Sequence, residues 1–308
     1  MTTQNVLRLQ AREDFVVTPA IDNICRRALT YLEAGYPCHF RGSAGTGKTT
    51  IAMHVAQQRG RPVLLMFGDE EFASGDLVGA TKGVHSTKIT DNFVRSVRKT
   101  EEFRRPQWVD SRLTNACKNG YTLVYDEFSR SRPEANNVLL TVLEEHILTL
   151  PDTQCGGNHV KVHPEFRAIF TSNPEDYAGV HKTQNALLDR MITMELDFYD
   201  RETEIAITSA RASLDRRLAE TVVDLVRRIR TLGFPQRPTL RASIMIARIM
   251  RQLESTGGPA AANPMFLDAC IDVLLPWSAS CVERDWLTAR QMVAGAIRSM
   301  NVEPVELT

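Results

Sequence analysis

Residues 42–49 read Gly42-Ser43-Ala44-Gly45-Thr46-Gly47-Lys48-Thr49 and fit the phosphate-binding loop G-x-x-x-x-G-K-[ST] at every fixed position. An apolar run from Pro37 to Phe40 precedes it, and a helix-like stretch from Thr49 to Arg59 follows it. This strand–loop–helix context separates a phosphate loop from an ordinary Gly-rich turn. Its glycines let backbone N–H groups surround phosphate oxygens, and the helix N-terminus adds partial positive charge. We therefore predict that residues Gly42 to Thr50 bind a nucleotide.

Charged and hydroxyl side chains near this loop predict ATP and Mg²⁺ as its ligands. We expect Lys48 to reach the β- and γ-phosphates and the Thr49 hydroxyl to ligate Mg²⁺. The pair Asp126-Glu127 ends the apolar run Tyr121–Tyr125, a pattern typical of a Walker B strand. Asp126 is expected to hold Mg²⁺, through water, and Glu127 to polarise the attacking water as general base.

A third strand end supplies a further candidate. Asn173 follows the apolar run from Arg167 to Ser172 and precedes Pro174. Its amide could orient the same water, although asparagine before proline is also an ordinary turn pairing. Because open α/β sheets bind ligands at the carboxyl ends of their strands, we favour the functional interpretation of Asn173.

The wider pattern predicts an α/β fold with a parallel central sheet flanked by helices. Continuous apolar runs at 62–67, 120–125, 167–172 and 191–196 are typical of strands covered on both faces. Between the second and third runs, Leu139, Val142, Leu143 and His146 recur with the spacing of one helix face. From about Asp200, helical periodicity dominates. We predict an N-terminal tail (1–17), an α/β nucleotide-binding core (18–199) and a smaller all-helical lid domain (200–308).

Composition narrows the class of protein. The 308 residues are 43% hydrophobic and 24% charged with zero formal net charge, so no global field favours nucleic acid. Nucleic-acid binding would need a local basic patch that the sequence does not show, and we predict none. No apolar run approaches the roughly 18 residues of a membrane-spanning helix, and Met1 to Asp14 lacks an apolar signal region. We expect a soluble, cytoplasmic protein without membrane insertion.

The six cysteines are scattered without a C-x-x-C pair: Cys25, Cys38, Cys117, Cys155, Cys270 and Cys281. Cys155 lies near His159 and His163, but three ligands without a fourth make a weak case for zinc. Buried, reduced thiols are the better interpretation for a chain of this composition.

The order of motifs resembles AAA+ ATPases of the MoxR group. The phosphate loop, Asp126-Glu127 and Asn173 are followed by Leu187-Leu188-Asp189-Arg190 and Pro238-Thr239-Leu240-Arg241. The resemblance implies that Arg190 is an arginine finger donated to a neighbouring subunit's γ-phosphate, and that Arg241 is a sensor 2 residue contacting its own nucleotide. A fixed guanidinium stabilises the negative charge that spreads as the γ-phosphate departs. It also implies a homo-oligomeric ring, with a hexamer as the family's form.

Three longer segments resemble the gas vesicle protein N family: Leu64 to Phe72, Trp108 to Thr114 and Tyr125 to Leu140. The similarity runs from roughly Thr18 to Arg251. It implies an ATP-hydrolysing chaperone or remodeller needed for gas vesicle assembly, with gas vesicle shell or accessory proteins as partners. It also implies that the protein can stay associated with the vesicle as a minor component.

Two alternatives and two segments stay open at this point. The same core would serve a MoxR-type activator of a metalloenzyme or Rubisco, working with an adaptor protein. A non-catalytic scaffold is the other alternative, although it would need neither Glu127 nor Arg190. Residues 80–105 and 148–163 are either partner-contacting insertions or solvated surface loops. The second has turn chemistry at its centre, Cys155 to Asn158, and is predicted to be a hairpin.

Overall fold

A computed structural model describes residues 15–91, 99–150, 159–173, 185–232, 237–257, 264–278 and 286–298. The chain divides into two compact units. The first contains Arg27–Arg41 and Thr49–Glu195. The second contains Ala11–Arg26, Gly42–Lys48 and the residues from Leu196 onward. Helix α1 (Pro19–Glu33) contributes residues to both units. Most of the predicted tail, up to Asp14, lies outside the described residues.

A parallel sheet organises the first unit. Within the described residues it has five strands in the order β2-β5-β8-β1-β9, all parallel. These are β1 (Cys38–Arg41), β2 (Val63–Phe67), β5 (Thr122–Asp126), β8 (Arg167–Ser172) and β9 (Ile192–Glu195). Every residue of β5 is buried, as is all of β8 after its first residue, which explains their unbroken apolar sequence. The predicted α/β fold with a parallel sheet is confirmed.

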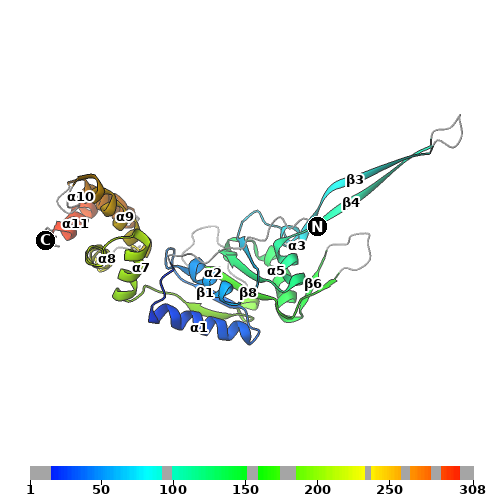
Figure 1. Ribbon diagram of the computed structural model, residues 1–308, viewed down its shortest axis with the longest axis horizontal. Coiled ribbons are helices and arrows are strands. Elements are labelled where there is room, and N and C mark those ends of the chain that lie inside the picture. The colour runs from blue at the N-terminus through cyan, green and yellow to red at the C-terminus, as the bar shows by residue number, and fades with distance from the viewer. Residues whose placement is uncertain are drawn as a thin grey trace. The chain divides into compact units, whose positions relative to one another are not determined.

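Helices connect these strands (Figure 1). They are α2 (Lys48–Gln58), α3 (Ser74–Val78), α4 (Arg112–Asn119), α5 (Pro133–Glu144) and α6 (Asn185–Leu188), with a short 3₁₀ turn η1 (Phe128–Arg130) after β5. Helix α4 begins where the Ser111 side chain caps it and ends at Gly120, whose φ of 68° is left-handed. Leu139 and Val142 of α5 are buried, as their spacing predicts.

The helical pattern predicted over 139–146 extends two residues beyond the observed helix. Helix α5 ends at Glu144, and His146 is exposed with a left-handed φ of 56°. That conformation turns the chain out of the helix and into β6 (Ile147–Thr149), where His146 O accepts a hydrogen bond from Val162 N. His146 therefore belongs to a turn and not to the buried helix face.

Strands of two antiparallel hairpins lie in the segments 80–105 and 148–163, whose role the sequence leaves open. Strands β3 (Gly79–Asp91) and β4 (Lys99–Asp110) form a long two-stranded ribbon with a register shift between Thr81 and Val84. Figure 1 shows it running out past α3 and α5. Strand β6 pairs with β7 (His159–Lys161), which confirms the predicted hairpin. The centre of that hairpin, including Cys155, lies outside the described residues, as do the side chains of 81–107.

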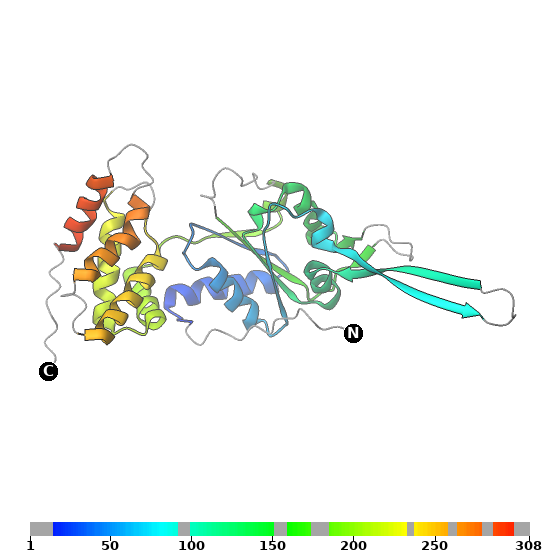
Figure 2. The same cartoon turned by 90° about the horizontal axis from the view of Figure 1, so that it is seen from above.

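From Arg201 onward, the regular structure in the described residues is helical, as predicted (Figure 2). Its helices are α7 (Arg201–Ala212), α8 (Arg216–Arg230), α9 (Leu240–Gly257), α10 (Pro264–Ser278) and α11 (Trp286–Arg298). The side chains of Asp200 and Asp215 cap α7 and α8. Val222, Val226 and Ile229 of α8 pack in one core with Ile246 and Met250 of α9. Each such side chain contributes about 1.5–3 kcal/mol when buried.

The described cysteines are buried thiols: Cys25, Cys38, Cys117 and Cys270. Burial raises the pKa of Cys38, Cys117 and Cys270 to about 12, so these thiols stay protonated and unreactive. This agrees with the interpretation as structural thiols, while Cys155 and Cys281 fall outside the described residues. No helix in the described part of the chain is long and apolar enough to cross a membrane.

Candidate nucleotide site

The phosphate-binding loop joins β1 to α2, as the sequence predicts. Gly45 and Gly47 have left-handed φ values of 81° and 87°, which a side chain would strain. Lys48 is 8% exposed, and its Nζ donates to the carbonyls of Gly42 and Ser43 at 2.6 and 2.7 Å. The ammonium group is therefore held within the curve of the loop, where an anion would meet it.

Residues after β9, which belong to the same unit as Gly42–Lys48, contact this loop. Tyr199 donates its phenolic hydroxyl to Thr46 O at 2.9 Å. A Cβ added at Gly45 would lie 2.3 Å from Thr239 Oγ1 and 3.3 Å from Arg241 Cβ. Arg241, in the first turn of α9, is thus next to the phosphate-binding loop with an exposed side chain. The contact between Arg241 and a bound phosphate stays a prediction.

The acidic pair lies at the carboxyl end of β5. Asp126 Oδ1 accepts hydrogen bonds from Thr49 Oγ1 at 2.7 Å and from Thr171 Oγ1 at 2.5 Å. The backbone N–H of Glu127 donates to the same Thr171 hydroxyl at 2.9 Å. One buried threonine of β8 therefore contacts both members of the pair, and Thr49 contacts Asp126 directly.

Oxygen donors at this point suit magnesium. The Thr49 hydroxyl and the Asp126 carboxylate are hard ligands, and Mg²⁺ is usually bound through one or two such groups while it keeps several waters. In the described part of the chain, no group of three or more His, Cys, Asp and Glu side chains is placed to hold a metal ion. The two predicted metal ligands are nevertheless adjacent, because the Thr49 hydroxyl donates directly to the Asp126 carboxylate.

Glu127 has an unusual backbone and a charged partner. Its φ of 52° is left-handed, which is uncommon for a residue with a side chain. Arg130 Nη1 donates to Glu127 Oε2 at 2.7 Å, and both side chains are about half exposed. A Cβ added at Gly68 would lie 2.0 Å from Glu127 O, so glycine at 68 makes room for this turn. Glycine at 68 and the left-handed turn at Glu127 therefore occur together at the carboxyl end of β5.

The two remaining candidates lie nearby in sequence but differ in surroundings. Asn173 directly follows β8 and is half-buried. Arg190 follows α6, and its Nε donates to Glu144 Oε2 of α5 at 2.8 Å, while its Nη1 donates to Ala186 O at 2.5 Å. The Arg190 side chain is 29% exposed. Within one chain, Arg190 is therefore engaged in an ion pair with Glu144.

The sequence did not predict three residues that make long-range polar contacts. Thr171 bridges Asp126 and Glu127, and Tyr199 contacts the phosphate-binding loop. His39 of β1 is buried between Ser172 Oγ, 2.8 Å from Nε2, and Thr193 Oγ1, 3.0 Å from Nδ1. Burial, helped by Arg41, lowers the pKa of His39 to about 4, so the ring is neutral at physiological pH. A polar residue inside an apolar strand was the one signal available for Thr171 and His39.

Known proteins resemble this chain closely. A family model described as AAA domain (dynein-related subfamily) matches residues 39–191. "Gas vesicle ATPase GvpN" of Ancylobacter aquaticus is 50% identical over 274 residues, 89% of this chain and 76% of that protein. "Gas vesicle ATPase GvpN" of Haloferax mediterranei is 42% identical over 263 residues, 85% of this chain and 74% of that protein.

Among solved structures, the Holliday junction branch migration motor RuvB of Thermotoga maritima has a TM-score of 0.52 with 16% identity. The match covers 87% of this chain and 73% of that one, and at that identity it shows a likeness of fold alone. The sequence similarities carry the family assignment, because they extend over most of both chains. The chain belongs to the gas vesicle ATPase family.

Proposed function

We propose that this protein hydrolyses ATP with Mg²⁺ and uses the cycle to remodel gas vesicle shell or accessory proteins during vesicle assembly. The observation that carries the catalytic part is the arrangement at Asp126, whose Oδ1 accepts from both Thr49 and Thr171. An aspartate with a purely structural role would not need a hydrogen bond from Thr49, the residue that follows Lys48 in the phosphate-binding loop. The partner class comes from the 50% identity to a protein named gas vesicle ATPase.

Each predicted residue has a role in the proposed reaction. The backbone N–H groups of Gly42 to Gly47 would bind phosphate oxygens, and Lys48 would turn from the loop carbonyls to the β- and γ-phosphates. Thr49 and Asp126 would hold Mg²⁺, which supplies neutralisation of phosphate charge when bound. Glu127, oriented by Thr171, would accept the proton of the attacking water, and Asn173 would orient that water.

Two arginines complete the proposed mechanism. Arg241 would contact the phosphates of its own nucleotide, supported by its place beside Gly45. Arg190 would act on the nucleotide of the next subunit, so each active site would need two copies of the chain. A head-to-tail contact of this kind closes into a ring, and we propose a hexamer from the family resemblance. We place this work in the cytoplasm, on growing gas vesicles.

Activation of a metalloenzyme or Rubisco is the weaker candidate. It would use the same ATPase core, but the strongest similarity over most of the chain is to gas vesicle ATPases. No described contact favours the second candidate.

The test is Lys48→Ala, made in vesicle-forming cells and in the purified protein. We expect loss of ATP binding and turnover, and cells with few or stunted vesicles. Lys118→Ala is the matched control, because Lys118 is a partly exposed lysine paired with Asp110. Normal vesicles in the Lys48→Ala strain would reject ATP-driven assembly. Unchanged turnover in the purified variant would reject the assigned site itself.

A further inference from the structure

A buried carboxylate lies at the centre of the helical unit. Glu204 of α7 is 1% exposed, and it accepts hydrogen bonds from two arginines of α8. Arg230 Nη1 donates to its Oε1 at 2.7 Å, and Arg227 Nη1 donates to its Oε2 at 3.1 Å. Apolar side chains would hold two helices together as well as a buried ion pair does. What the charged cluster adds is a set of directed hydrogen bonds.

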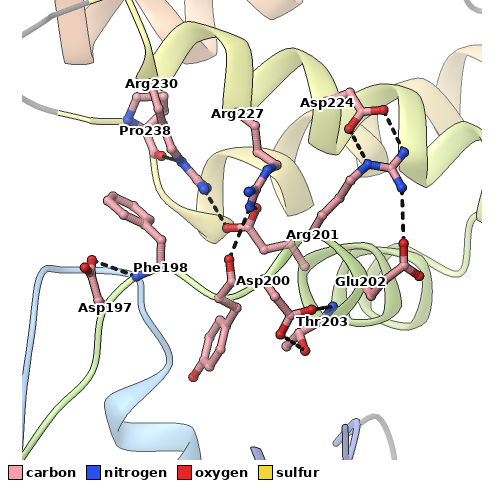
Figure 3. Close-up of polar contacts among 12 residues, drawn as sticks. Asp197, Phe198, Asp200, Arg201, Glu202, Thr203, Asp224, Arg227, Arg230 and Pro238 are labelled. Atoms are coloured by element: carbon pink, nitrogen blue, oxygen red, sulfur yellow. Dashed lines mark hydrogen bonds and ion pairs between the residues drawn. The ribbon is translucent and has the colours of Figure 1, made fainter. Parts of the chain in front are cut away.

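Arg230 makes contacts in three directions. Besides Glu204, its Nε donates to Pro238 O at 2.6 Å, and its guanidinium carbon lies 4.3 Å from the centre of the Phe198 ring (Figure 3). The side chain is 9% exposed. Burial lowers the pKa of Arg230, and the Glu204 carboxylate acts in the opposite direction. Arg230 thus connects α8 to Phe198, in the segment after β9. It also connects α8 to Pro238, which directly precedes Thr239 in the chain.

Arg227 extends the cluster toward the phosphate-binding loop. Its Nη1 also donates to Tyr199 O at 3.2 Å, and the Tyr199 hydroxyl donates to Thr46 O. On the other side, Pro238 is followed by Thr239, whose hydroxyl lies against Gly45. The contacts therefore form a closed path that leaves the loop at Thr46, passes through Glu204 and returns at Gly45.

We propose that Arg230, held by Glu204, is a positioning residue that fixes Arg241 and Tyr199 against the phosphate-binding loop. The inference rests on the proposed function, because the position of Arg241 matters only if a nucleotide binds there. Arg230 itself touches no phosphate and acts through Arg241.

A matched control exists between the same two helices. Arg201 of α7 makes a two-point ion pair with Asp224 of α8, with Nε–Oδ1 and Nη2–Oδ2 distances of 2.7 and 2.8 Å. Both side chains are 41% exposed, and Figure 3 shows the pair apart from Pro238 and Phe198. Arg201→Gln therefore breaks a link between α7 and α8 without changing the path to Arg241.

The experiment compares Arg230→Lys with Arg201→Gln in the full chain. Lysine keeps a positive charge beside Glu204 but lacks the planar fork that reaches Glu204 and Pro238 together. We expect Arg230→Lys to melt at a lower temperature than Arg201→Gln, because the Arg230 side chain is 9% exposed and that of Arg201 is 41% exposed. The affinities are therefore compared at a temperature where both variants are folded. Only Arg230→Lys should bind a fluorescent ATP analogue with Mg²⁺ more weakly, with a Kd about tenfold higher than that of the wild type. In an Arg241→Ala background, Arg230→Lys should cause little further loss.

Several results would overturn the inference. Equal loss of affinity in Arg201→Gln would mean that any α7–α8 link has the same effect, and additive losses with Arg241→Ala would mean that Arg230 acts elsewhere. Wild-type affinity in Arg241→Ala would also overturn it, while leaving the ATPase proposal to the separate Lys48→Ala test. Phe198→Leu, which removes the ring under the guanidinium, applies the same criteria if Arg230→Lys fails to fold.

Discussion

The hydroxyl of Thr171 donates to Asp126 Oδ1 at 2.5 Å and accepts the backbone N–H of Glu127 at 2.9 Å. Because β8 lies next to β5 in the sheet, one fully buried side chain positions two consecutive acidic residues. The proposed metal ligand and the proposed general base therefore depend on a common group that itself carries no charge.

Thr171→Val should separate this positioning role from nucleotide binding. Valine has a similar shape but leaves the Glu127 N–H without its acceptor, which costs about 1–3 kcal/mol when such a group is buried. We expect lower stability in urea titration and a clear loss of ATP turnover, with the affinity for ATP retained. Thr171→Ser is the matched control, because it keeps the hydroxyl. Equal turnover in the two variants would show that the hydroxyl does not position the acidic pair.

Glu127→Gln should bind ATP but hydrolyse it slowly. The amide keeps the side chain's shape and loses the basic oxygen, and the loss of such a group lowers rates by roughly 10²–10⁴-fold. Phosphate release at saturating ATP measures this directly. Glu134→Gln removes an exposed acid from the first turn of α5 and should leave turnover unchanged. Wild-type rates in Glu127→Gln would remove Glu127 from the mechanism.

The strands and the phosphate-binding loop could be predicted from sequence because each is encoded locally. The apolar runs at 62–67 and 167–172 needed no partner to be recognised as buried strands, and the observed β2 and β8 match them. Thr171 was different. Its role arises because β8 is the neighbour of β5, and strand order is a property of the whole sheet.

Long-range side-chain contacts escaped prediction for the same reason. Tyr199 reaches Thr46, 153 positions earlier in the chain, and nothing in the local pattern around either residue indicates the pair. Glu202 and Glu204 both lie in the first turn of α7, and nothing in the local sequence distinguishes the buried acid from the exposed one. Burial of Glu204 follows from how α8 packs against α7.

Acid should weaken the fold through His39. Its pKa falls from 6.5 to about 4 in the folded protein because burial disfavours the charged ring. The unfolded chain therefore takes up the proton first as the pH drops. The stability due to neutral His39 is present above pH 6.5 and is lost as the pH falls toward 4. The loss is on the order of 3 kcal/mol at 1.36 kcal/mol per unit.

His39→Asn isolates this effect from the titration of carboxylates, which both proteins share. We expect the free energies of unfolding of the wild type and the variant to differ most near neutral pH and to converge in acid. Urea titrations at several pH values measure both curves. Curves that stay parallel across this range would show that His39 does not titrate with the predicted shift.

Arg190 supplies the test of a shared active site. In one chain it pairs with Glu144, so Arg190→Ala could act either by breaking that pair or by removing a finger from the next subunit. Glu144→Ala breaks the same pair and leaves the guanidinium in place. If Arg190 is a finger, Arg190→Ala should bind ATP normally and lose turnover by roughly 10³-fold or more, while Glu144→Ala stays active. Equal losses in the two variants would assign Arg190 to the structure of its own chain.

Mixing two inactive proteins decides whether Arg190 acts in trans. Lys48→Ala lacks a phosphate-binding lysine and Arg190→Ala lacks the finger, so a mixed oligomer contains some interfaces where an intact Lys48 site meets an intact Arg190. Activity should reappear on mixing, and the specific activity of the wild type should rise with protein concentration as the oligomer forms. Each variant incubated alone at the same total concentration is the control. Without recovery in oligomers shown to be mixed, and with wild-type activity independent of concentration, each chain would have to complete its own site, and Arg190 would remain the partner of Glu144.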